Sequence, residues 1–170
     1  MPASERAEVG PEVVFGWAMG LTPGQILELG RAVTQMVAAG APLDVGRGFG
    51  IAWDARVRIP RKERDAMLRE FADLEISVGS VLMGRDLRAE EPTTPSRGLG
   101  ALFDQLVLPK NRLESQAGEA INRSGDPGRR GLVALWNAWV AMRYRAIIPA
   151  PTFELLVRPW VSVVGPLPEP

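Results

Sequence analysis

The densest group of residues with functional chemistry is a basic cluster made of Arg56, Arg58, Arg61, Lys62 and Arg64. The cluster spans the end of an alternating segment and the first turn of a predicted helix after Pro60. Cations are electrostatically unfavourable at a helix N-terminus, and a bound anion would offset this because free amides and guanidinium groups both donate to it. We therefore predict an anion site for phosphate or nucleic acid. The alternative is a solvated surface that Asp54, Glu63 and Asp65 neutralise.

Aromatic residues form the second candidate site. The run "RGLVALWNAWVAMRYRAIIP", residues 130–149, is apolar almost all round its helical projection, so we expect a central core helix that is buried on most sides. Trp, Tyr and Arg are also enriched at protein interfaces and in ligand pockets. The second reading is therefore an interface or apolar pocket formed by Trp136, Trp139, Tyr144, Arg143 and Trp160.

Most catalytic chemistry is excluded by composition, because the chain has no cysteine and no histidine. This removes thiolate nucleophiles and His-dependent triads, and leaves Asp, Glu, Lys and one tyrosine for proton transfer. Glu70 with Asp73, and Glu114 with Glu119, are conceivable carboxylate pairs, but neither has the spacing of a metal motif. The glycines of "GRGFG" fit no nucleotide fingerprint. We predict no catalytic residues, no metal and no cofactor, and favour a protein that is not an enzyme.

Charge and hydropathy indicate a globular chain. Acidic and basic residues balance at 20 each, so no global field attracts nucleic acid, and 46% of the residues are apolar. The N-terminus has no apolar targeting segment, and the longest apolar run is broken by Asn137, Arg143 and Arg145. We therefore expect a cytoplasmic protein without a membrane span.

Hydrophobic periodicity predicts two well-defined helices. Thr22 with Gln25 forms a capping box before a helix that ends near Gly40, and Asp126 with Pro127 begins a helix that continues to about residue 148. A third helix should follow Pro60 to about Leu74, whereas 75–83 is compatible with helix or strand. Shorter helices are expected over 99–107 and from about 109–111.

Two segments read as strands. Residues 49–59 alternate apolar and polar side chains, and 153–164 is rich in Val, Phe and Trp. We therefore predict a mainly helical α+β fold, with four or five helices around the central apolar helix and a small antiparallel sheet. Residues 1–12 would be a flexible tail, and 13–170 a single domain with a loop at 84–98.

Three octets resemble one another: "RGFGIAWD" at 47, "RGLGALFD" at 97 and "RGLVALWN" at 130. Whether they reflect duplication stays open, because their spacing is unequal. For function, we predict a non-catalytic interaction or scaffold protein that self-associates or binds a protein partner. The alternatives are a protein that binds a small apolar or anionic ligand, a carboxylate-dependent enzyme, and a phosphate or nucleic-acid binder that uses the basic cluster.

Overall fold

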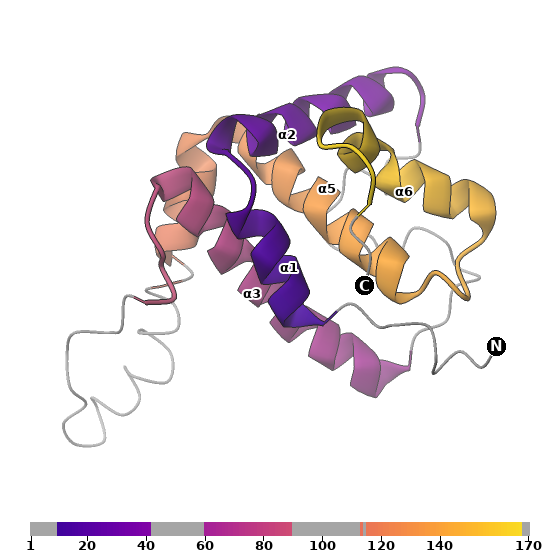
Figure 1. The fold of residues 1–170 in the computed structure, drawn as a ribbon, viewed down its shortest axis with the longest axis horizontal. Coiled ribbons are helices and arrows are strands. Elements are labelled where there is room, and N and C mark those ends of the chain that lie inside the picture. The colour runs from indigo at the N-terminus through magenta and orange to yellow at the C-terminus, as the bar shows by residue number, and fades with distance from the viewer. Residues whose placement is uncertain (1–9, 42–59, 90–112, 114, 168–170) are drawn as a thin grey trace.

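The computed structural model describes residues 10–41, 60–89, 113 and 115–167, and this part of the chain is helical (Figure 1). The named helices are α1 (Pro11–Met19), α2 (Pro23–Ala38), α3 (Arg61–Met83), α5 (Gly125–Arg143) and α6 (Ala150–Val163). A further helical segment over 115–123 leads directly into α5. Helix α1 is one that the sequence analysis did not identify.

The core is built around α5, as the sequence predicted. Every residue from Gly131 to Met142 is buried, and α2, α3 and α6 all pack against this helix (Figure 1). The predicted bounds differ slightly, because α5 begins at Gly125 and ends at Arg143. Asp126 lies in the first turn, and Ser124 holds the N-cap position.

Local signals place α2 where the capping box predicted it. The Thr22 amide donates to Gln25 Oε1 at 2.8 Å, and the Gln25 amide donates to Thr22 Oγ1 at 3.1 Å. Pro23 occupies the first turn, where its missing N–H costs nothing. Beyond the helix, Gly40 adopts a positive φ of 96° that other residues reach only with strain.

The predicted sheet is wrong. The described residues contain no strand, and the segment 153–164 belongs almost entirely to helix α6. Its Val, Phe and Trp residues have high strand propensity, but Phe153, Leu156 and Trp160 recur at helical spacing and face the core. Burial of that face outweighs the propensity, even though Pro159 lies inside the helix. The other predicted strand, 49–59, lies outside the described residues.

The open question over 75–83 is settled as helix, because α3 continues to Met83. Two buried serines in this stretch satisfy their hydroxyls within the helix. Ser77 Oγ donates to the Asp73 carbonyl at 2.9 Å, and Ser80 Oγ donates to the Ile76 carbonyl at 2.8 Å. Gly84 then ends the helix in the left-handed conformation, with φ at 71°.

Two glycines allow α2 and α5 to cross in direct backbone contact. A Cβ atom built on Gly30 would lie 1.8 Å from the Pro127 carbonyl oxygen. A Cβ on Gly131 would lie 2.3 Å from the Ile26 carbonyl oxygen. Any larger side chain would therefore force the helices apart. Gly131 is the glycine of the third octet, while the first two octets, starting at residues 47 and 97, lie outside the described residues.

Candidate functional site

The basic cluster predicted from the sequence is only partly described. Arg61 and Lys62 are the first two residues of α3, and both are exposed. Arg64 follows in the same helix, whereas Arg56 and Arg58 lie outside the described residues. Pro60 holds the N-cap position and supplies no side-chain cap. The anion site therefore stays a prediction, with two of its members at an uncapped helix start.

Four residues that join α3 to α5, Glu63, Glu70, Arg143 and Tyr144, form what we term the α3–α5 polar cluster. Arg143 Nη1 donates to Glu70 Oε1 at 2.6 Å, and each of these side chains is only 15% exposed. The Tyr144 hydroxyl donates to Glu63 Oε1 at 2.7 Å and contacts Met67 Sδ at 3.3 Å. Two carboxylates of α3 thus accept hydrogen bonds from two side chains at the C-terminal end of α5.

The Arg143 guanidinium also lies near aromatic rings. Its central carbon is 5.2 Å from the centroid of the Trp139 ring and 5.7 Å from that of Tyr144. A cation in such a place gains attraction from the ring faces, which adds to the ion pair with Glu70. The cluster therefore combines a partly buried ion pair, a tyrosine–carboxylate hydrogen bond and cation–π contacts.

The electrostatics of the cluster keep Tyr144 protonated. Burial raises the pKa of the Tyr144 phenol far above its ordinary value, and the hydrogen bond to Glu63 raises the pKa further, while Arg143 opposes the shift. A phenol in this state donates a hydrogen bond and does not act as a phenolate nucleophile near neutral pH. The arrangement is thus suited to structural linkage rather than to proton transfer.

One buried polar atom of the cluster lowers the stability of the closed contact between α3 and α5. Glu70 Oε2 is buried and has no hydrogen-bond partner among the described residues. A buried acceptor without a donor costs roughly 1–3 kcal/mol, and more when the group is charged. The cluster therefore holds α3 on α5 at an energetic disadvantage that apolar packing would avoid.

The predicted aromatic candidates separate into two groups. Trp136 and Trp139 are each 1% exposed, with ring centroids 4.6 Å apart, and Phe71 of α3 meets Trp136 edge-on at 5.2 Å. These tryptophans thus share the α3–α5 boundary with Arg143 and Tyr144. Trp160 lies elsewhere, tilted against Trp17 of α1 at 5.6 Å. Its indole N–H donates to the Pro166 carbonyl at 3.3 Å.

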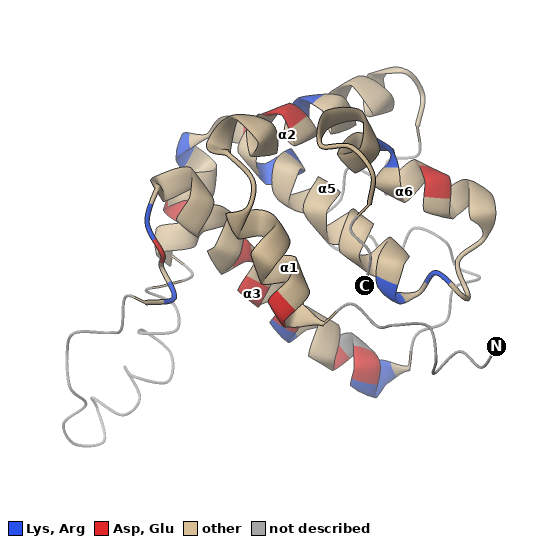
Figure 2. Cartoon of the chain, in the orientation of Figure 1, with Lys and Arg blue, Asp and Glu red and all other residues tan. Residues whose placement is uncertain are grey.

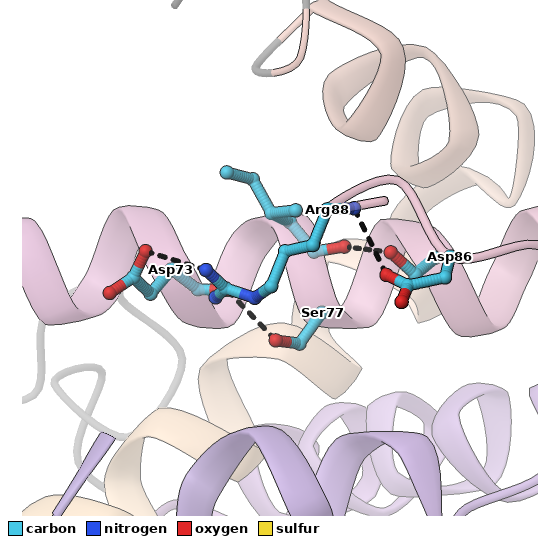
Figure 3. Close-up of polar contacts among 6 residues, drawn as sticks. Asp73, Ser77, Asp86 and Arg88 are labelled. Atoms are coloured by element: carbon cyan, nitrogen blue, oxygen red, sulfur yellow. Dashed lines mark hydrogen bonds and ion pairs between the residues drawn. The ribbon is translucent and has the colours of Figure 1, made fainter. Parts of the chain in front are cut away.

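The carboxylates Glu70 and Asp73 do not form an acid–base pair, because each is bound to a different arginine. Asp73 Oδ1 lies 3.2 Å from Arg88 Nη1, and Arg88 Nη2 donates to the Asp73 carbonyl at 3.0 Å (Figure 3). The Arg88 amide donates to Asp86 Oδ1 at 3.0 Å. The Arg88 guanidinium lies over the Phe15 ring of α1. This contact ties the turn after α3 to α1. In the described part of the chain, no group of three or more acidic residues could hold a metal ion.

Sequence reasoning missed the role of Glu63 and Glu70. A signal was present, because both flank Met67 at spacings of four and three residues, which places all three on one helix face. The partners were not visible, since Tyr144 lies 81 positions from Glu63. No family model, curated protein or solved structure matches the chain. Within the described ranges, no helix is long and apolar enough to cross a membrane.

Proposed function

We propose that the chain is a non-catalytic interaction protein of the cytoplasm that self-associates. The observation that carries the proposal is the surface of α1. Its sequence, "PEVVFGWAM", has Glu12 as the only charged residue, yet only Val14, Trp17 and Ala18 are buried. Figure 2 shows that charge on α1 is confined to its N-terminal end. Helices that are apolar on all sides are normally buried, so this face is suited to cover by another protein surface.

The outer face of α1 has the composition expected of a small contact. Val13 and Met19 are 37% and 39% exposed, and Gly16 lies exposed between them along the helix. A Cβ on Gly16 would meet nothing within 4 Å, so a second helix has room to approach closely. A nine-residue helix supplies much less than the roughly 800 Å² per partner of a standard interface. We therefore expect weak association.

Sedimentation equilibrium over a wide concentration range tests the proposal. The weight-average mass of the wild type should rise above the chain mass of 18.5 kDa as concentration increases. The double variant Val13→Glu, Met19→Lys should stay monomeric, because the new charges would be desolvated at the contact. Both charges suit the helix dipole at their ends of α1, so the monomer should keep its stability.

A matched control comes from a different exposed apolar residue. Ile147, between α5 and α6, is 55% exposed, and Ile147→Lys should associate as the wild type does. A constant mass of one chain at every concentration would refute self-association. Equal loss of association in the control and the α1 variant would show that α1 is not the contact.

Anion binding is a second candidate, which the exposure of Arg61 and Lys62 at the start of α3 supports. The free amides of that uncapped turn would add donors for a phosphate or carboxylate group. A ligand there would also offset the repulsion between the two cations and the helix dipole.

A further inference from the structure

The two ends of α3 are held in different ways. Near its C-terminal end the contact is close and apolar, since a Cβ on Gly79 would lie 2.6 Å from the Ala117 Cα. Just beyond, Leu87 is fully buried and its amide donates to Ser80 Oγ at 2.9 Å. The Gly79–Ala117 contact, which leaves no room to shift, fixes that end of α3 against the segment 115–123, and the Leu87–Ser80 bond anchors the following turn on α3.

Among the described residues, the N-terminal end of α3 is held mainly by the α3–α5 polar cluster. Glu63 and Glu70 supply the two bonds to α5, and Met67 is the fully buried apolar residue between them. Figure 1 shows the first turns of α3 extending past the N-terminal end of α1, so α1 does not cover them. Within the described part of the chain, the contacts that secure residues 61–70, which we term the latch segment, are therefore chiefly polar bonds.

Local energetics make this end of α3 the weaker one. The helix begins without a side-chain cap, and its first two residues are cations at the positive end of the dipole. The buried oxygen Glu70 Oε2, without a donor among the described residues, adds a cost to the closed position. Buried ion pairs contribute little net stability, and their best-attested use is to fix a register or a switch.

We propose that the latch segment detaches from α5 in an opening much smaller than global unfolding, with the Gly79–Ala117 contact as the fixed end. This opening uncovers Arg143 and Tyr144, residue types that are enriched in binding hot spots. In the closed form, the carboxylates of Glu63 and Glu70 accept the hydrogen bonds from Tyr144 and Arg143. The inference goes beyond self-association and does not depend on it.

Native-state hydrogen exchange in low urea tests the latch on the intact chain, at a concentration where sedimentation finds one chain. Amides of residues 65–70 should exchange at least roughly tenfold faster than those of residues 132–142, with a smaller dependence on urea, because a local opening exposes less surface. Equal exchange free energies and equal urea slopes for the two groups would overturn the proposal, since they would leave global unfolding as the only route.

A variant pair locates the latch. Glu70→Gln should accelerate exchange in residues 65–70 by roughly tenfold or more, because Arg143 loses its counter-charge in a partly buried site. Asp73→Asn, which alters the partly exposed ion pair with Arg88 about one turn further along α3, should leave those amides unchanged. If both variants accelerate exchange equally, or neither does, the polar cluster is not the latch. Failure of self-association would show only in sedimentation and would leave these exchange results intact.

Discussion

The backbone contact between α2 and α5 gives a sharp prediction about glycine. A Cβ on Gly30 would lie 1.8 Å from the Pro127 carbonyl oxygen, whereas real contacts of this type are not shorter than 3.0 Å. The first turn of α5 would have to move about 1 Å away from α2, a form of overpacking that costs roughly 1–3 kcal/mol or more. Gly30→Ala should therefore lower the free energy of unfolding, despite the better helix propensity of alanine.

Gly118 provides a control with identical chemistry. It lies within the helical segment 115–123, and a Cβ there would meet nothing within 4 Å. Gly118→Ala should stabilise the protein by roughly 0.5–1 kcal/mol, because alanine loses less conformational freedom in a helix. The two substitutions should thus differ in sign, with a gap of roughly 1.5–4 kcal/mol between them.

Urea unfolding, followed by tryptophan fluorescence and by circular dichroism, measures both effects. Coincident transitions with unchanged slopes would show that stability, and not the unfolding mechanism, has changed. The reasoning is refuted if Gly30→Ala is as stable as Gly118→Ala, since α2 and α5 would then tolerate separation at their crossing.

Two further predictions concern titration and anions. Tyr144 is the only tyrosine, so tyrosinate absorbance reports on it alone. The pKa of Tyr144 in the folded protein lies above the unfolded value of about 10. The stabilisation that comes from the buried, protonated phenol should therefore persist below pH 10 and fall as pH rises further. Tyr144→Phe should abolish that part of the alkaline loss, and normal titration of Tyr144 in the folded state would contradict the burial argument. Polyphosphate should bind with strong salt dependence and lose affinity in Arg61→Gln, Lys62→Gln, whereas unchanged affinity would reject the anion site.

The helix α6 shows where sequence reasoning failed. Its Val, Phe and Trp residues suggested a strand, because composition was weighed above spacing. The spacing of Phe153, Leu156 and Trp160 already favoured a helix. For residues 22–40 the prediction of a helix is confirmed, because a capping box marks the start of α2 in addition to the helical spacing.

The candidate site was predictable in part. The residue types of Arg143, Tyr144 and Trp139 were enough to make them site candidates. The sequence did not indicate that Glu63 and Glu70 are the partners of Tyr144 and Arg143. Pairing across more than 70 positions depends on where α3 packs, and local sequence carries no information about that. Similarly, glycines 30 and 118 look alike in sequence, and only the neighbouring backbone distinguishes them.

Features that depend on near neighbours along the chain follow from the amino-acid sequence alone. These are the start of α2, which its own hydrogen bonds define, and the burial of α5, which follows from an apolar surface on all sides. Tertiary structure alone decided which helices α5 meets, which glycines permit close crossing, and which carboxylates face Arg143 and Tyr144. The physical reason is that packing and buried pairing are set by distances between segments far apart along the chain, whereas capping and amphipathicity act within a few turns.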